Sequence, residues 1–417
     1  MENPKIRFKG FTKDWEQRKV GELLEERNEQ APMSEDYPLM AFIANQGVTQ
    51  KGERYDRSAL VNDETGKKYK RTEFGDFIYS SNNLETGSIG LNKYGNACIS
   101  PVYSIFKSTG KAELDFLGRR FLRKDFINEM VKWRQGVVYG QWKIHETDFM
   151  KIEVRIPSVD EQKKIGLYFD SLDNLITLHQ RKCEQTKKLK KYMLQKMFPQ
   201  NGEKVPEIRF DGFTYDWEQR KLGEVLISLQ NNTLSRADLS NERGIAKNVH
   251  YGDVLIKFGD VLDVSREQLP MITDEKILDK YKASFLQNGD VIIADTAEDT
   301  TVGKCSEIAG LRDEVVLSGL HTIPYRPVEK FATGYLGYYL NSSAYHDQLI
   351  PLMQGIKVTS ISKSAMQDTD VVYPKSTEEQ AMIGSYFQSL DNIITLHQRK
   401  CDELKKMKKY MLQNMFI

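Results

Sequence analysis

Two long stretches of the chain carry apolar residues at the alternating spacing of four and three that is typical of a coiled coil. Each begins at a Ser-x-x-Glu capping box, Ser158–Glu161 or Ser376–Glu379, in which the serine accepts a backbone N–H and the glutamate reaches back. We expect two helices of about 40 residues, each ~60 Å long. The expected seam residues are Ile165, Phe169, Leu172 and Ile176 in the first helix and Ile383, Phe387, Leu390 and Ile394 in the second.

The seam continues through His179 and Cys183, and through His397 and Cys401 in the second stretch. Four such side chains brought together could hold zinc. Side chains at these spacings are normally packed inside a seam, however, so we favour core packing and predict no metal site.

The pattern does not identify the partner of each helix. We expect the two helices to pair with each other, antiparallel and within one chain, which would place one intervening domain at each end of the pair. The alternative is that each helix pairs with a second copy of the chain.

The chain also repeats itself. Residues 4–23 and 206–225 match at fifteen of twenty positions, and residues 161–198 and 379–416 match at twenty-eight of thirty-eight. The regions between these matches share only a few short similar segments. A repeat of this length indicates duplicated domains rather than a solenoid, and it predicts a pseudo-twofold arrangement.

Each variable region mixes short strand-like runs with helical ones, so we expect a mixed α+β fold. The expected strands in the first region are 77–79 and 97–99, with a helix over 114–131, and those in the second are 289–294 and 315–317, with a helix over 332–340.

The composition limits the classes of protein that are possible but does not indicate a function. The 417 residues carry a net charge of +1, so a DNA-binding surface would need local separation of charge. Cys98, Cys183, Cys305 and Cys401 are widely spaced, as in a reducing cytoplasm. We see no secretion signal and no run of the roughly 20 apolar residues that would span a bilayer, so a cytoplasmic protein is expected.

No motif of a known catalytic class is evident, and we predict no catalytic residue. The variable regions instead contain basic and polar-aromatic clusters, which suit phosphates and base edges but also ordinary solvated loops. The candidate DNA-binding residues are Lys51, Arg54, Tyr55, Arg57, Lys70, Arg71, Asn82, Asn83, Tyr139, Gln141 and Lys143 in the first region, and Lys280, Lys282, Thr300, Thr301, Lys304, Lys357, Thr359 and Ser360 in the second.

The layout resembles the specificity (S) subunit of type I restriction-modification enzymes. The residues that carry the resemblance are the RFxGFTxDWEQRKxGE boxes at 7–22 and 209–224 and the IGxYFxSLDNxITLHQRK helices. The resemblance covers the whole chain. It implies an N-terminal box with target-recognition domain 1 at 1–157, a spacer helix at 158–200, a second box with target-recognition domain 2 at 201–375, and a second spacer helix at 376–417.

The resemblance implies that each recognition domain reads one half of a bipartite double-stranded DNA target. It also implies that the helices set the spacing and dock two methyltransferase (M) subunits, and that restriction (R) subunits join the complex. The chain itself would not be an enzyme, because S-adenosylmethionine, ATP and magnesium would belong to the partner subunits. The alternatives are a two-module DNA-binding transcription regulator and a coiled-coil interaction scaffold.

Overall fold

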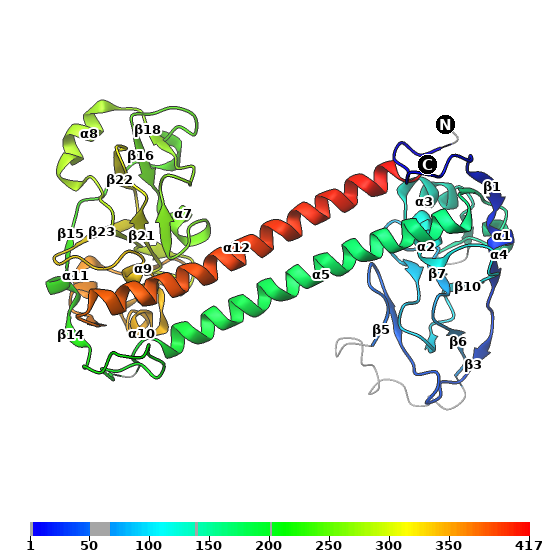
Figure 1. Ribbon diagram of the computed structural model, residues 1–417, viewed down its shortest axis with the longest axis horizontal. Coiled ribbons are helices and arrows are strands. Elements are labelled where there is room, and N and C mark those ends of the chain that lie inside the picture. Colours follow the sequence, from blue (N-terminus) through cyan, green and yellow to red (C-terminus); the bar gives the residue numbers. More distant parts are fainter. Residues whose placement is uncertain (1–2, 51–66, 138–140, 201) are drawn as a thin grey trace. The chain divides into compact units, whose positions relative to one another are not determined.

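The computed structural model describes residues 3–50, 67–137, 141–200 and 202–417. The chain divides into two compact units (Figure 1): unit 1 is Met1–Leu178 with Lys400–Ile417, and unit 2 is His179–Arg399. Each unit therefore contains one variable region, the first half of one long helix and the last part of the other. No helix in the described ranges is both long enough and apolar enough to cross a bilayer.

Unit 1 is built around a four-stranded sheet in the order β2-β10-β7-β8 and a three-stranded sheet in the order β3-β6-β9. Two-stranded pairs β1–β13, β4–β5 and β11–β12 complete it. The elements are β1 (Glu16–Lys19), α1 (Val20–Leu23), β2 (Leu24–Glu26), β3 (Gln30–Ala31), β4 (Ala41–Ile43), β5 (Gly47–Thr49), β6 (Tyr69–Thr72), β7 (Phe77–Tyr79), β8 (Ile89–Leu91), β9 (Ala97–Ile99), β10 (Ser104–Ser108), α2 (Leu114–Phe121), α3 (Lys124–Val131), β11 (Gln135–Val137), β12 (Gln141–Lys143), α4 (Glu146–Phe149) and β13 (Glu153–Ile156).

Unit 2 repeats this plan with a five-stranded sheet, β15-β23-β19-β21-β17, and a three-stranded sheet, β18-β16-β22. The pair β14–β25 corresponds to β1–β13, and β20–β24 is the remaining pair. The elements are β14 (Glu218–Lys221), α6 (Leu222–Val225), β15 (Leu226–Ser228), β16 (Ala246–Val249), α7 (Tyr251–Ile256), β17 (Val261–Asp263), β18 (Met271–Ile272), α8 (Glu275–Tyr281), β19 (Val291–Ala294), β20 (Thr296–Ala297), β21 (Cys305–Ala309), β22 (Val316–Ser318), β23 (Thr322–Pro327), α9 (Tyr335–Asn341), α10 (Ser343–His346), β24 (Thr359–Ser360), α11 (Lys363–Gln367) and β25 (Asp370–Tyr373), with 3-10 turns η4 (Arg236–Asp238), η5 (Lys282–Ser284) and η6 (Ile350–Leu352).

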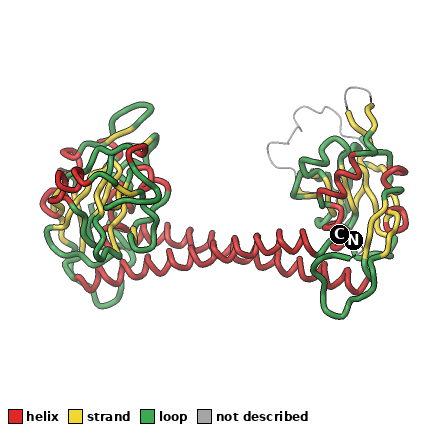
Figure 2. Tube along the Cα trace, turned by 90° about the horizontal axis from the view of Figure 1, so that it is seen from above, coloured by secondary structure: helices red, strands yellow, loops and turns green. Residues whose placement is uncertain are grey.

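The long helices expected from the apolar spacing are present as α5 (Val159–Lys196) and α12 (Thr377–Asn414). Within each unit they lie side by side and run in opposite directions (Figure 2). The expected seam residues Ile165, Phe169 and Leu172 belong to the core of unit 1, and Ile383, Phe387 and Leu390 belong to that of unit 2. Ile176 and Ile394 are half-buried.

The expectation of one helix over 114–131 is wrong, because the chain forms two helices with a break at Leu122 and Arg123. Arg123 is extended there, with φ −72° and ψ 145°. Its guanidinium donates to the carbonyl of Leu412 on α12 and to Asp125, 2.9 Å away. The corner also stacks Phe121 on Phe126, with ring centroids 4.3 Å apart. These nonlocal contacts outweigh the local helical periodicity.

The carboxylates of the capping-box glutamates bind the boxes, a role that the sequence motif did not indicate. Glu161 accepts two hydrogen bonds from Arg7 of the first box, at 2.6 and 2.8 Å. Glu379 accepts the matching pair from Arg209 of the second box, at 2.6 and 2.9 Å. Both carboxylates are nearly buried, with 1% and 2% of the side chain exposed. Each box is therefore fixed to the start of the long helix in its own unit.

Each box also contacts the far end of the other long helix. The amide of Ile6 donates to the carbonyl of Asn414 at 2.9 Å, and the amide of Ile208 donates to that of Lys196, also at 2.9 Å. Phe416 packs against Phe169 in unit 1. Phe198 stacks on Phe387 in unit 2. The two units therefore share one set of contacts, made by matching residues of the repeat.

Lys190 and Lys408, at matching positions of the repeat, form ion pairs between the two long helices. Lys190 lies 2.5 Å from Asp391 and 2.7 Å from Asp260 in unit 2, and Lys408 pairs with Asp173 in unit 1. Burial lowers the pKa of Lys190, but the carboxylates of Asp260 and Asp391 outweigh it and hold the pKa above its usual range. The lysines thus take the place of apolar seam residues.

The seam of unit 2 also contains a pair of histidines. The Nδ1 atoms of His179 and His397 lie 2.9 Å apart, so one ring donates to the other only while at least one is neutral. Burial, and then the neighbouring His179 and Lys182, lowers the pKa of His397 below its ordinary value. The Cys183 thiol lies beside this pair, 3.8 Å from the Gln398 side-chain oxygen.

We expect unit 2 to lose stability as the pH falls through and below the ordinary histidine value of 6.5. A lowered pKa in the folded state means that unfolding takes up protons there, so the stabilisation is present above that pH and lost below it. His397→Asn is expected to flatten the pH dependence of the melting temperature between about pH 7 and pH 5. An unchanged slope in this variant would show that the acid sensitivity has another origin.

Candidate nucleic-acid interface

Two segments of unit 1 that lie far apart in the sequence meet beyond the end of β7. The loop that follows this strand holds Ser81 and Asn82, and β12 and the residue after it lie against them. The amide of Trp142 donates to the Asn82 side-chain oxygen at 2.6 Å, and the amide of Ile144 donates to the Ser81 hydroxyl at 3.0 Å. The candidates Asn82, Asn83 and Gln141 are thereby brought to one place.

Charged contacts hold this place rigid. Arg134, which follows α3, forms two hydrogen bonds with Glu85 of the same loop, at 2.9 and 2.6 Å. The Lys143 ammonium lies 2.5 Å from Glu146, which also accepts from Ser104 at 2.7 Å. Burial raises the pKa of Glu146, but these two hydrogen bonds outweigh it, so the pKa lies below the usual range. Lys143 is thus already paired.

In unit 2 the matching segments also meet, but through backbone pairing instead of side-chain acceptors. The segment after β19 pairs with β24, with Thr296 opposite Ser360 and Ala297 opposite Thr359. The amide of Ile361 donates to the carbonyl of Asp295 at 2.9 Å, in the position that Ile144 and Ser81 occupy in unit 1. Gln354 and Ser360 exchange backbone hydrogen bonds, which close the loop that carries Lys357. The candidates Thr359 and Ser360 therefore join the segment that leads to Thr300 and Thr301.

A hollow of about 530 Å³ adjoins this place. It is lined by Asp295 and Ile361 from the two meeting segments and by the candidate Lys280 from α8. Lys282 is exposed just beyond α8. Thr301 turns back to Asp299, with its hydroxyl 2.5 Å from the carboxylate.

Three other candidates have their cationic groups occupied elsewhere. The Lys70 ammonium donates to the carbonyl of Tyr103 at 3.0 Å, and the Lys304 ammonium donates to the carbonyls of Leu255 and Phe258 at 2.8 and 3.1 Å. Burial lowers the pKa of both lysines. Arg71 pairs with Glu29 at 2.6 Å and stacks over the Tyr37 ring. Their cationic groups are therefore not free to contact DNA as the sequence suggested.

Several candidates fall outside the residues that the structure describes. They are Lys51, Arg54, Tyr55, Arg57 and Tyr139.

Some residues at the interface are not among the candidates chosen from the sequence, although Trp142 belongs to the polar-aromatic cluster around Gln141. Trp142 is half-exposed on β12, and Gln230, Asn231 and Lys363 line the hollow in unit 2. The amide run Gln230-Asn231-Asn232 was the available signal, because amide side chains suit adenine. Lys363 is an isolated surface lysine in the sequence, and no sequence signal set it apart.

The two meeting places present amides, hydroxyls and an indole. The scaffold is held by bonds to the Asn82 and Ser81 side chains in unit 1 and by backbone pairing in unit 2. An amide side chain can form two hydrogen bonds with the edge of one adenine base. Hydroxyls serve as donor or acceptor to base edges, and exposed lysines contact phosphates. Such a surface can read base edges, and the two units present different groups for doing so.

Comparison with known proteins supports this interpretation. The family model described as the type I restriction modification DNA specificity domain matches residues 12–188 and again residues 215–406. The chain is 24% identical over 371 residues to the type I restriction enzyme MjaVIII specificity subunit of Methanocaldococcus jannaschii, covering 86% of this chain and 84% of that protein.

Two solved structures share the fold. The S subunit of a type I restriction-modification system from M. genitalium has a TM-score of 0.56 at 12% identity, with 100% of this chain and 99% of that chain covered. A chain from a study of complex assembly in the type I R-M system has a TM-score of 0.52 at 17% identity, with 97% and 98% covered.

Proposed function

Since this chain belongs to the family of type I restriction modification DNA specificity domains, we propose that it selects the DNA target of such a system. Each unit reads one half of a bipartite double-stranded target. The observation that supports this division is the repeated meeting place after β7 and after β19. Matching segments of the repeat meet in both units, through the Asn82 and Ser81 side chains in unit 1 and through backbone pairing in unit 2, and the side chains that they present differ, as two different half-sites require.

The chemistry belongs to partner subunits in this proposal. M subunits bring S-adenosylmethionine and methylate the DNA, and R subunits bring ATP and magnesium. The chain itself is not an enzyme and contributes target choice. It also contributes spacing, because α5 and α12 are uninterrupted helices of 38 residues that we propose pair as an antiparallel coiled coil with pseudo-twofold symmetry.

The docking surfaces for M subunits are apolar positions that the long helices leave exposed. Unit 1 exposes Leu175 and Leu178 of α5, and unit 2 exposes the matching Ile393 and Leu396 of α12, each at 40–52%. The same holds for Met407 and Tyr410 in unit 1 and for Leu189 and Tyr192 in unit 2, each at 44–58%. Exposed apolar groups that recur at matching positions indicate two equivalent protein-binding surfaces, one for each of two M subunits.

We expect Leu178→Glu to remove one M subunit and Leu396→Glu to remove the other. A charge placed in an apolar contact costs an interface about 2 kcal/mol or more. Native mass spectrometry at saturating M should give a two-M complex for the unchanged chain, a one-M complex for each variant and no complex for the double variant. Methylation of target DNA should fall as the number of bound M subunits falls.

The two variants are each other's control, because they alter matching positions of the repeat. Circular dichroism should show that both fold, since both leucines are exposed. A double variant that still binds two M subunits would exclude these helix surfaces as docking sites, and a loss of both subunits from either single variant would exclude two independent surfaces.

A further inference from the structure

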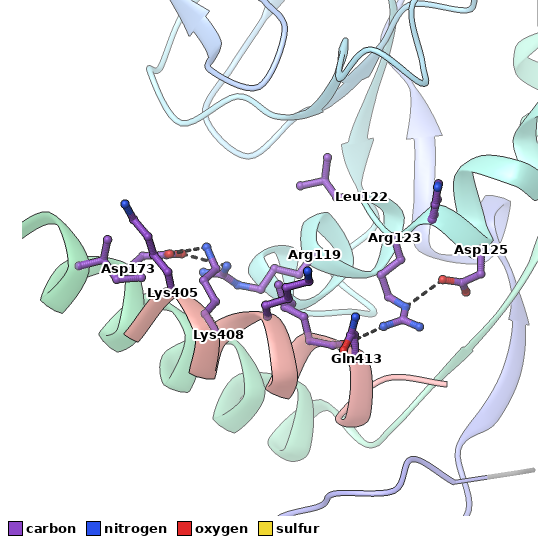
Figure 3. Close-up of a pocket in the computed structure, with 12 residues that line it drawn as sticks. Arg119, Leu122, Arg123, Asp125, Asp173, Lys405, Lys408 and Gln413 are labelled. Carbon is purple, nitrogen blue, oxygen red and sulfur yellow. Dashed lines mark hydrogen bonds and ion pairs between the residues drawn. The ribbon is translucent and has the colours of Figure 1, made fainter. Parts of the chain in front are cut away.

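Unit 1 contains a basic hollow that the proposed function does not use. It has a volume of about 580 Å³ and lies where the corner between α2 and α3 faces the last turns of α12 (Figure 3). Six cationic side chains line it against two carboxylates, Asp125 and Asp173. The cationic residues are Arg119, Arg123, Lys124, Lys405, Lys408 and Lys409.

Both carboxylates are already neutralised. Asp173 binds Arg119 at 3.0 Å and also Lys408, and Asp125 binds Arg123 at 2.9 Å. Lys124, Lys405 and Lys409 are exposed and have no ion-pair partner in the described part of the chain. The hollow therefore carries three positive charges that no carboxylate of the described residues pairs.

The floor of the hollow is apolar. Leu122 lies at the helix corner with 49% of its surface exposed, and Ile176 and Leu412 from the long helices lie beside it, both half-buried. An apolar group that covered these side chains would gain roughly 25 cal/mol for each Å² removed from water. The ligand that fits thus has an apolar part as well as negative charge.

Unit 2 does not carry the same charges at the matching place. Arg119 donates to Asp173, and the corresponding donor to Asp391, which is the repeat equivalent of Asp173, is the Tyr338 hydroxyl at 2.7 Å. The amides of Glu113 and Ala332 donate in the same way to Gln162 and Gln380, which also match in the repeat.

The start of α3 in unit 1 corresponds to the start of α10 in unit 2. Arg123 is the N-cap of α3 and Lys124 its first residue, whereas Ser342 is the N-cap of α10 and Ser343 its first residue. Three cations of unit 1 are thus replaced by a tyrosine and two serines, although the lysines of the long helices are repeated.

We propose that this hollow binds an acidic segment of a partner protein, with an apolar side chain seated on Leu122 between flanking carboxylates, once per chain. The carboxylates of the segment pair with Lys124, Lys405 and Lys409. Because only unit 1 carries the full charge, this contact makes the two halves of an otherwise repeated assembly unequal. It goes beyond the two equivalent docking surfaces, since Lys405 and Lys409 lie about 160° around α12 from the stripe of exposed apolar residues.

Two observations favour a protein segment over DNA backbone. A phosphodiester gains nothing from the apolar floor, and it binds lysines on any open surface. A contact to the backbone is also independent of base sequence, so it would be useful in both units, whereas the arginines here are present in one unit alone.

The test measures binding of the full chain to a fluorescein-labelled peptide of acidic residues with one central leucine, by fluorescence anisotropy. Lys405→Glu with Lys409→Glu is expected to weaken binding by at least about tenfold, because charge complementarity is reversed. The matched control is Lys187→Glu with Lys191→Glu, which alters the same repeat positions in unit 2 and is expected to change the affinity less than about twofold. Leu122→Ser tests the floor and should weaken the leucine peptide but not an all-acidic one.

Equal losses in the two double variants would show a general charge effect and overturn the proposal. So would absence of peptide binding to the unchanged chain, or loss of binding to a non-target DNA duplex while peptide binding persists in the Lys405 and Lys409 variant. All four lysines are exposed, so misfolding does not explain a loss, and circular dichroism of each variant checks this.

Discussion

Glu379→Ala is expected to destabilise unit 2 by about 3–5 kcal/mol, the cost of leaving one charge of a buried ion pair without its partner. Arg209 loses both hydrogen bonds while 12% of its side chain is exposed, so water cannot replace them fully. Trp217 loses its indole hydrogen bond to the same carboxylate, at 3.2 Å. Urea unfolding followed by tryptophan fluorescence measures the change.

Glu161→Ala in unit 1 is the matched variant. It breaks the Arg7 pair, but the indole nitrogen of Trp15 has no hydrogen-bond partner in the described structure, so one bond fewer is lost and the effect should be smaller. Replacing Arg209 and Glu379 together by leucine should recover part of the loss, because no unpaired charge remains. A loss below about 1 kcal/mol for Glu379→Ala would show that water reaches Arg209 and that the pair behaves as a surface ion pair.

Exchange of residues 24–157 for those of another family member is expected to change one half of the methylated DNA motif completely and leave the other half intact. The exchanged part begins at β2 and ends just after β13, which pairs with β1 of the retained box from Glu16 opposite Ile156 to Lys19 opposite Glu153. Methylome sequencing of a host that carries the chimaera with its M subunits gives both halves in one experiment.

A suitable donor keeps two contacts to the retained helices. The amide of residue 113 must reach Gln162, and an aromatic ring at position 116 must stack on Phe416, with centroids 5.3 Å apart in this chain. The matched experiment exchanges 226–375 and should alter the other half alone. A chimaera that is active but changes both halves, or neither, would contradict independent reading by the two units.

The features that could be predicted from sequence are those set by local spacing. The long helices follow from apolar residues three and four apart, and the strands at 77–79 and 97–99 follow from short apolar runs. The helix over 114–131 fails because its break depends on Leu412, which lies 289 residues from Arg123. No periodicity within the segment contains that information.

The candidate interface shows the same limit. Asn82 and Gln141 were each chosen for their chemistry, but only the fold shows that Trp142, beside Gln141, binds Asn82. Lys70 and Lys304 have the same chemistry in the sequence as exposed lysines, and the carbonyls that hold them belong to residues distant in the sequence. In the sequence, the lysines at the end of α12 are typical of a solvated helix face. Only the structure shows that the α2–α3 corner lies against them.

The contribution of Met415 and Phe416 to the core of unit 1 affects how the protein is made in the cell. Ribosomes add roughly 5–20 residues per second, so unit 1 waits on the order of ten to fifty seconds after Leu178, while all of unit 2 is translated, before its core can close. During that time its aromatic residues are open to chaperones and proteases. A stop codon before Met415 should therefore disable the recognition half that was translated first.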